Sequence, residues 1–198
     1  MIGIIDYGAG NLRSVKRALD FLEVDSCIIQ SADQFDGLEK VILPGVGAFQ
    51  SAVEKLKEQC LFEKTGEWLQ AGKPFLGICL GMQVLLESSE ESPEVEGFGI
   101  LKGDVPRFKH HRVPQIGWNQ VSFLKSSHIL AGLENHAFFY FLHGYYVRPF
   151  DGDSVVGATE YGVTYPSIIQ QDNIFGVQFH PEKSGKNGLK LLRNWVEL

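Results

Sequence analysis

Apolar runs of strand length alternate with helical hydrophobic patterns along the first half of the chain. The apolar runs cover residues 2–6, 24–30 and 40–43, and a fourth begins at Phe75 after Pro74. The helical patterns between them end at about Leu22, Gln59 and Ala71. Strands that alternate with helices are joined by right-handed crossovers, so this pattern predicts a parallel sheet covered by helices.

The pattern changes after Gly99, where short strand-like runs follow one another with turn residues between them. These runs cover residues 100–101, 113–123, 138–147, 154–160, 167–171 and 174–179, and a last helical pattern covers residues 188–196. Consecutive short strands favour antiparallel pairing. The predicted fold is α/β, with an open, mixed, mainly parallel sheet of the flavodoxin-like kind, flanked by helices and extended by antiparallel strands in the C-terminal half. We expect a single domain over residues 1–198, because no linker or repeat interrupts the pattern.

The composition narrows the classes of partner. The 198 residues are 44% apolar and carry a formal net charge of −6, which argues against a nucleic-acid-binding surface. No apolar run approaches the length of a membrane span, and no signal-peptide pattern is present. Three widely separated cysteines, Cys27, Cys60 and Cys79, predict neither a disulfide framework nor a metal site. We therefore expect a cytoplasmic protein that binds no membrane, nucleic acid or metal.

The turn at residues 7–11 matches a dinucleotide-binding fingerprint only in part. Gly8 and Gly10 fit, but Arg13 stands at the third glycine position. The sequence therefore indicates no nicotinamide cofactor, and no phosphate loop or metal cluster indicates another cofactor. The turn either only connects a strand to a helix, or it faces a partner through Asn11.

A nucleophile is predicted where the apolar run from Phe75 meets a helical pattern beginning at Leu80. The junction reads Gly77-Ile78-Cys79-Leu80-Gly81, the cysteine version of a nucleophile elbow. The flanking glycines permit the close backbone approach of such a turn. The start of a helix favours a thiolate at Cys79, although an isolated free cysteine is more often a small buried hydrophobic residue.

Two backbone segments are candidates for stabilising negative charge on a substrate carbonyl. The N–H group of Leu80 follows the cysteine directly. The loop of Gly45, Val46 and Gly47, just past a strand end, is the candidate for a second donor, although it reads equally well as a turn with no role. Gln83 lies one helical turn after Cys79, where its carboxamide could orient a polar substrate.

His180 is the best candidate for a base among six histidines, because it directly follows the apolar run at residues 174–179. Pro181 restricts its backbone, and an extended chain at residues 180–182 would place Glu182 beside the imidazole. A carboxylate there can hold the ring as the third member of a triad. The other histidines read as polar loop (His110, His111), turn (His128, His136) or core or pocket (His143).

Together, Gly-Ile-Cys-Leu-Gly-Met-Gln at residues 77–83 and Phe-His-Pro-Glu at 179–182 resemble the class I glutamine amidotransferases, the triad-type glutaminases. The segments at residues 5–12, 43–49 and 113–119 narrow the resemblance to the glutaminase subunits of imidazole glycerol phosphate synthases, in histidine biosynthesis. Two positions depart from the pattern of those subunits. Gln115 stands where a histidine is usual. Gly144 stands directly after His143, where a hydroxyl residue is often found, so only backbone contacts to glutamine remain at that position.

The resemblance implies that Cys79 attacks glutamine, that His180 and Glu182 assist, and that His143, Gly144 and Tyr145 lie at the glutamine site. It also implies a separate (β/α)8-barrel synthase (cyclase) subunit that forms a heterodimer with this chain, receives ammonia through a channel and makes imidazole glycerol phosphate. The residues expected at that subunit contact are Asn11, Trp118, Tyr140 and Lys183.

Three other functions are compatible with the same residues. The chain could serve a different synthase, such as that for anthranilate, although Trp118 and its neighbours resemble that type less. It could be a stand-alone cysteine hydrolase acting on peptides or small amides, which would need no partner. It could also be a non-catalytic adaptor whose elbow cysteine is inert or senses redox state.

Overall fold

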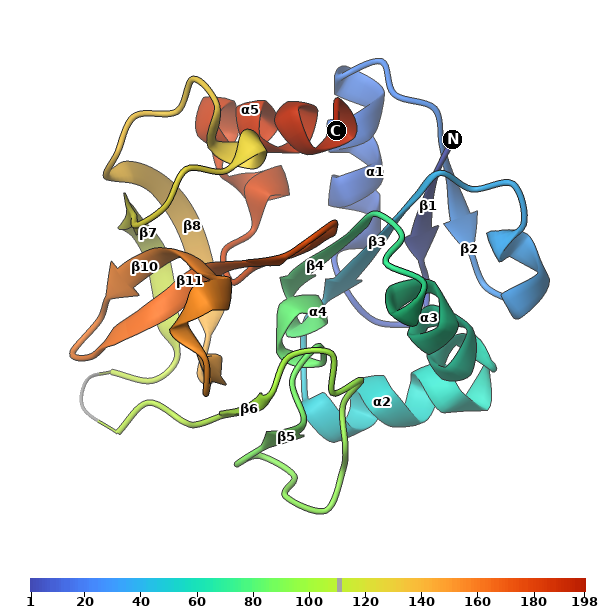
Figure 1. Ribbon diagram of the computed structural model, residues 1–198, viewed down its shortest axis with the longest axis horizontal. Helices are drawn as coiled ribbons and strands as arrows, with labels where there is room; N and C mark the ends of the chain where they lie inside the picture. The colour runs from blue at the N-terminus through green and yellow to red at the C-terminus, as the bar shows by residue number, and fades with distance from the viewer. Residues whose placement is uncertain (110–111) are drawn as a thin grey trace.

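A nine-stranded mixed sheet forms the centre of the protein, seen here in a computed structural model (Figure 1) that describes residues 1–109 and 112–198. His110 and His111 lie outside the described residues. Five neighbouring strands run parallel, in the order β2-β1-β3-β4-β12. Their bounds are β1 Ile2–Ile5, β2 Ser26–Ile29, β3 Lys40–Gly45, β4 Phe75–Cys79 and β12 Ile174–Val177. This order is the 2-1-3-4-5 arrangement of flavodoxin-like sheets, so the predicted fold class is confirmed.

Helices cover both faces of the parallel strands because side chains alternate along each strand. Ile2 and Ile4 of β1 pack on the side of α1 and α5, whereas Ile5 packs on the side of α2 and α3. The α-helices are α1 Leu12–Phe21, α2 Phe49–Glu58, α3 Leu61–Gln70, α4 Leu80–Gln83 and α5 Gly185–Val196. Short 3-10 helices are η1 Ala32–Phe35, η2 His128–Leu130, η3 Gly152–Ser154 and η4 Pro181–Lys183.

Four antiparallel strands extend the sheet beyond β12, as the change of pattern after Gly99 predicts. They follow in the order β11-β10-β7-β8. Their bounds are β7 Gln115–Phe123, β8 Ala137–His143, β10 Val155–Glu160 and β11 Thr164–Gln171. On β7, Ile116 and Trp118 point away from the core, so one face of this extension is apolar and open to solvent.

The prediction of a strand at residues 100–101 is wrong. That segment is irregular, and its neighbour β6 (Gly103–Val105) instead joins β5 (Ser88–Ser89) and β9 (Arg148–Pro149) in a small second sheet. Strands of two or three residues carry too little periodicity for a sequence to predict. The prediction of an extended chain at residues 180–182 is wrong from Pro181 onward: His180 has an extended backbone, but Pro181 and Glu182 lie in η4.

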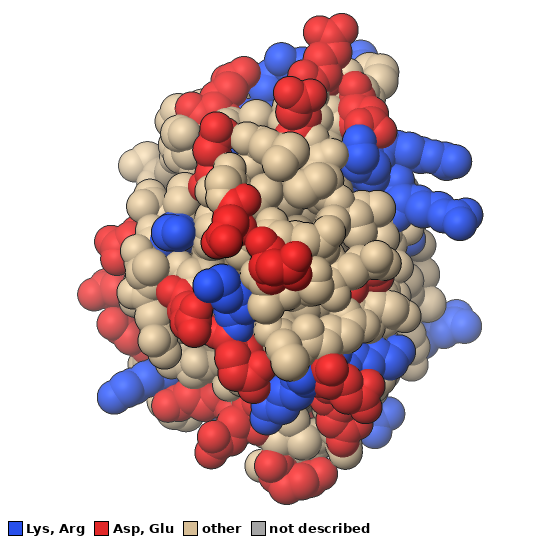
Figure 2. All heavy atoms as spheres, turned by 90° about the vertical axis from the view of Figure 1, so that its right-hand side faces the viewer, with Lys and Arg blue, Asp and Glu red and all other residues tan. Residues whose placement is uncertain are grey.

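The side of the molecule where β2 forms the sheet edge carries charged side chains of both signs. Figure 2 shows acidic and basic side chains interspersed over that side. None of the described helices is both long enough and apolar enough to cross a membrane.

Candidate active site

Cys79 occupies a sharp turn between β4 and α4, as the elbow pattern predicts. Its backbone has φ 55° and ψ −106°, and its side chain is buried. A residue other than glycine rarely adopts a positive φ, and such strain is typical of a nucleophile held at the top of a sheet. The strand-to-helix elbow is therefore confirmed by the backbone itself.

The two flanking glycines are sterically required. A Cβ on Gly77 would lie 2.4 Å from the carbonyl oxygen of Gly81, and one on Gly81 would lie 1.9 Å from that of Leu43. Neither backbone can accommodate a methyl group at these distances. The elbow therefore packs directly against β3. This strand leads into the loop at residues 45–47, the candidate for the second oxyanion donor.

That loop, Gly45, Val46 and Gly47, lies beside the nucleophile. In the pairing of β3 with β4, Gly45 is the partner of Cys79. A Cβ on Gly45 would lie 2.7 Å from Cβ of Leu80, and Gly47 has a φ of 109°, which favours glycine. The two candidate sources of oxyanion donors thus meet at one place.

The acid–base pair reaches Cys79 through the pairing of β12 with β4, in which Val177 is the partner of Ile78. Both strands end at the same edge, so the chain that follows β12 brings His180 to the elbow. Nδ1 of His180 lies 2.9 Å from Oε1 of Glu182, and the side chains are 1% and 0% exposed. The predicted contact is present even though η4, not an extended chain, produces it.

The charge state of His180 follows from its neighbours. Burial lowers the pKa of the imidazole, but the negative charge of Cys79 and the Glu182 carboxylate outweigh it and raise the pKa to about 10. Nε2 is buried and has no partner of hydrogen-bonding geometry among the described residues. An imidazolium thus lies beside a sulfur nucleophile, with one ring nitrogen available to the reacting atoms.

Asn11 contacts the triad directly, which the sequence did not indicate. Its Nδ2 donates a hydrogen bond to Oε1 of Glu182 at 2.9 Å. The turn before α1 therefore helps to hold the carboxylate that holds His180. This contact leaves open the prediction that Asn11 also meets a partner.

The side chains of His143 and Gln83 contact other protein groups in this structure. Nδ1 of His143 lies 2.7 Å from the carbonyl oxygen of Tyr145, and Nε2 lies 3.2 Å from Oη of Tyr165. Burial lowers the pKa of His143, and the charge of His180 lowers it further. These effects outweigh the hydrogen bond to Tyr145, which raises the pKa, and leave it at about 3, so the ring is neutral. Nε2 of Gln83 donates to the same Tyr145 carbonyl at 3.0 Å. Roles for these residues in glutamine binding stay predictions.

The two departures from the family pattern lie in and beside this network. Gln115 is buried, and its Oε1 accepts a hydrogen bond from Tyr165 at 2.8 Å, one step from His143. Gly144 lies against Val113, where a Cβ would come within 3.3 Å of Cγ1. Its carbonyl accepts from the N–H group of Phe108.

Gln178 is a site residue that the sequence reasoning missed. Its side chain is fully buried, and Nε2 donates a hydrogen bond to Sγ of Cys79 at 3.6 Å. The available signal was a polar residue within the apolar run at residues 174–179. Glu91 was also missed: its Oε2 accepts from the N–H group of Phe49 at 2.7 Å and so anchors the chain just after Gly47.

Two of the four residues predicted at a subunit contact, Trp118 and Tyr140, lie on one apolar surface, the β7–β8 face, defined here as Ile116, Trp118, Phe138 and Tyr140. The first three are 62%, 56% and 49% exposed, and the rings of Trp118 and Tyr140 pack edge to face at 6.1 Å. Lys183 is exposed on η4. Exposed aromatic residues that cluster in this way are typical of a protein interface.

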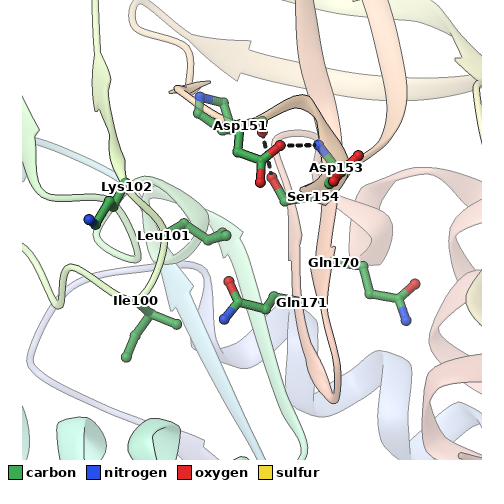
Figure 3. A pocket seen from close by; sticks show the side chains of 9 residues that line it. Ile100, Leu101, Lys102, Asp151, Asp153, Ser154, Gln170 and Gln171 are labelled. Atoms are coloured by element: carbon green, nitrogen blue, oxygen red, sulfur yellow. Dashed lines mark hydrogen bonds between the residues drawn. The ribbon is translucent and has the colours of Figure 1, made fainter.

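A cavity of about 360 Å³ lies away from the triad, between residues 100–102 and the loop that contains Asp151, Asp153 and Ser154. Figure 3 shows that these polar groups bond to one another: Oδ1 of Asp151 accepts from the N–H group of Asp153, and Ser154 donates to the Asp151 carbonyl. The cavity contains none of the predicted site residues.

The elbow cysteine, the imidazole and the carboxylate lie together at one edge of the sheet, as the nucleophile, base and acid of a triad would. Residues 3–198 match the family described as "Glutamine amidotransferase class-I", so the chain belongs to the class I glutamine amidotransferases.

The curated relatives are more specific. The chain is 49% identical to imidazole glycerol phosphate synthase subunit HisH of Methanocaldococcus jannaschii over 199 residues, which cover all of both chains. It is equally identical to the HisH subunit of Pyrococcus furiosus, covering 100% of this chain and 98% of the relative. The resemblance drawn from the sequence motifs is confirmed.

Solved structures agree on the fold. A structure of PurLQS from Thermotoga maritima has a TM-score of 0.81 at 19% identity, covering 99% of this chain and 97% of that chain. A crystal structure of a glutamine amidotransferase has a TM-score of 0.78 at 21% identity, also covering 99% of this chain and 97% of that chain.

Proposed function

We propose that this chain is the glutaminase subunit of an imidazole glycerol phosphate synthase, and that it supplies ammonia in histidine biosynthesis. The observation that carries the proposal is the meeting of Cys79 with His180 and Glu182 at one sheet edge, where Nδ1 of His180 lies 2.9 Å from Oε1 of Glu182. The HisH relatives of equal length support the choice of synthase. The free cysteines of the chain suit the reducing cytoplasm, where we place the protein.

In the first half of the reaction, the thiolate of Cys79 attacks the side-chain carbonyl carbon of glutamine. The N–H groups of Leu80 and of the loop at residues 45–47 receive the negative charge on the carbonyl oxygen, and loss of one such donor typically costs ~3 kcal/mol. The C–N bond then breaks as His180 donates its Nε2 proton to the departing nitrogen. Ammonia leaves, and a γ-glutamyl thioester remains on Cys79.

In the second half, neutral His180 accepts a proton from water, whose oxygen attacks the thioester carbon. Collapse of the adduct breaks the C–S bond, which releases glutamate and regenerates the thiolate and the imidazolium. Glu182 keeps the ring in one orientation through both halves. No cofactor or metal takes part in these steps.

The ammonia acceptor is proposed to be a (β/α)8-barrel synthase subunit that docks on the β7–β8 face. Tyr140 connects this face to the base. The side chain of Tyr140 belongs to the face, while its carbonyl accepts from the N–H group of His180 at 2.9 Å. Its own N–H group donates to Oγ of Ser184 at 3.0 Å, and that hydroxyl donates to the carbonyl of His180 at 2.6 Å. A partner that docks on this face would therefore contact Tyr140, whose backbone is hydrogen-bonded to that of the catalytic histidine.

The loop at residues 45–47 supports a gating step. If its backbone must turn to direct an N–H group at the oxyanion, glutamine hydrolysis stays slow until the partner and acceptor are bound. The isolated chain is then expected to have low glutaminase activity that rises greatly in the complex.

The test is to purify the chain with a barrel subunit, then to measure glutamate release with and without the ammonia acceptor of that subunit, a phosphoribulosyl precursor of imidazole glycerol phosphate. The proposal expects a stable heterodimer, a large activation by acceptor, and no turnover by a Cys79→Ala variant that melts at the wild-type temperature. A chain that is equally active alone on glutamine or peptides would support a stand-alone hydrolase. Activation only by an anthranilate-type synthase would assign it to that enzyme.

A further inference from the structure

The nucleophilic sulfur has polar neighbours that favour opposite charge states. The carbonyl oxygen of Leu142 lies 3.7 Å from Sγ of Cys79, where it suits an S–H donor. Nε2 of Gln178 lies 3.6 Å from the same sulfur and can only donate to it. The balance between thiol and thiolate therefore depends in part on what holds the Gln178 amide in place.

The orientation of that amide is fixed by a chain of alternating donors and acceptors. The carbonyl of Tyr145 can only accept, so Gln83 must direct its Nε2 towards it, at 3.0 Å. Nε2 of Gln83 also donates to Oε1 of Gln178 at 3.3 Å. Since Oε1 of Gln178 then faces Gln83, its NH2 group faces Cys79. Reversal of the Gln178 amide would bring two NH2 groups together at Gln83, and it would place a carbonyl oxygen against the sulfur, which suits only the thiol.

The chain continues away from the sulfur through His143. Its Nδ1 lies 2.7 Å from the Tyr145 carbonyl, and its ring is neutral. The Tyr145 carbonyl thus lies between two side chains, Gln83 and His143. The side chains of Gln83, His143 and Gln178 are buried and therefore costly to leave unpaired, which stabilises one arrangement of the whole.

We propose that Gln178 is a positioning residue for Cys79: its Nε2–H group holds the sulfur in the attacking position as a thiolate, and Gln83 fixes the amide that does so. This inference rests on the proposed function only for the identity of the attacked substrate. In this arrangement Gln178, a residue outside the triad, donates a hydrogen bond that favours the thiolate, whereas the carbonyl of Leu142 favours the thiol.

The titratable groups around the sulfur do not duplicate this effect. His180 supplies the positive charge, and Glu182 lies behind it. Burial, with a contribution from the charge of Cys79, raises the pKa of Tyr7 and of Tyr165 well above 10, so both stay neutral. Gln178 is thus an uncharged donor whose removal changes no other charge.

The experiment follows alkylation of Cys79 by iodoacetamide in the isolated full-length chain, between pH 5 and pH 10, with the modified peptides quantified by mass spectrometry. Gln178→Met removes the donor at similar volume, and Gln171→Met, an exposed glutamine on β11, is the matched control. Exposed Cys60 is alkylated in the same sample and serves as an internal reference. Neither glutamine nor a partner is present, so a negative result here leaves the proposed function untouched.

For Gln178→Met we expect alkylation of Cys79 at pH 7 to fall about tenfold, because a hydrogen bond to a charged group is lost. The pH of half-maximal alkylation rises by about one unit, and the rate recovers near pH 10. Gln178→Glu, with an acceptor in place of the donor, shifts the profile further in the same direction. Wild-type pH profiles in both variants would overturn the proposal, as would a loss of rate that is equal at every pH.

A measurement on the unmodified protein covers the case in which both variants unfold. In the ¹⁵N spectrum, the side-chain amide signals of Gln178 are expected to shift over the pH range in which Cys79 becomes reactive, while those of Gln171 stay fixed. A Gln178 amide that does not respond while alkylation turns on contradicts the assignment.

Discussion

The contact between Asn11 and Glu182 leads to a quantitative prediction about the triad. Oε1 of Glu182 accepts two hydrogen bonds, from His180 and from Asn11, each 2.9 Å long. Oε2 is buried and has no partner among the described residues. Asn11→Leu therefore removes one of the two hydrogen bonds that hold a fully buried carboxylate.

The expected loss follows from the charge on the acceptor. A hydrogen bond to a charged group contributes about 1.5–3 kcal/mol, and about 1.4 kcal/mol corresponds to a factor of ten in rate. If the full contribution holds Glu182 against His180 in the transition state, kcat for glutamine hydrolysis falls roughly ten- to a hundredfold. The partner and acceptor are supplied at saturation, so that weaker docking does not contribute to the measured kcat.

Lys183→Met is the matched control, because Lys183 adjoins Glu182 but is exposed and is expected only at the subunit contact. It should raise the partner concentration needed for half activation and leave kcat at saturation within about twofold. If Asn11→Leu behaved in the same way, with wild-type kcat at saturating partner, its contact with Glu182 would have no catalytic role.

Three further predictions concern the elbow, the charge on His180 and its connection to the β7–β8 face. Gly81→Ala forces a Cβ within 1.9 Å of the Leu43 carbonyl, so calorimetry should show a lower unfolding temperature and a loss of roughly 1–3 kcal/mol or more of stability. The pKa of His180 is raised from 6.5 to about 10, so its protonation contributes stability that is fully present below pH 6.5 and lost as pH rises through 10. Between about pH 9 and pH 11, denaturant titrations should therefore show a larger loss of unfolding free energy in wild type than in Cys79→Ala, where the thiolate is absent; equal losses would refute this origin. Ser184→Ala breaks the bridge from Tyr140 to His180, and kinetics should show a smaller ratio of activated to basal glutaminase rate, whereas an unchanged ratio would exclude this route.

The chain itself determined the features that depend on local sterics and periodicity. The spacing of apolar residues predicts the parallel half of the sheet because strands that are buried on both faces form short apolar runs between the helical patterns. The sequence indicates the elbow because only glycine fits at positions 77 and 81, and it indicates the base because His180 follows an apolar run. Pairing of Cys79 with His180 needed only the rule that parallel strands end at one edge.

Tertiary structure alone decided the contacts that tune the site. Asn11 and Glu182 are 171 positions apart, and Gln178 and Cys79 are 99 apart, so no periodicity connects either pair. These contacts exist because β12 pairs with β4 and because the turn before α1, which contains Asn11, lies against η4. Both arrangements are set by the packing of the whole sheet. The short strands β5, β6 and β9 were unpredictable for the same reason: their hydrogen bonds are made with distant segments, and two or three residues leave no pattern of their own.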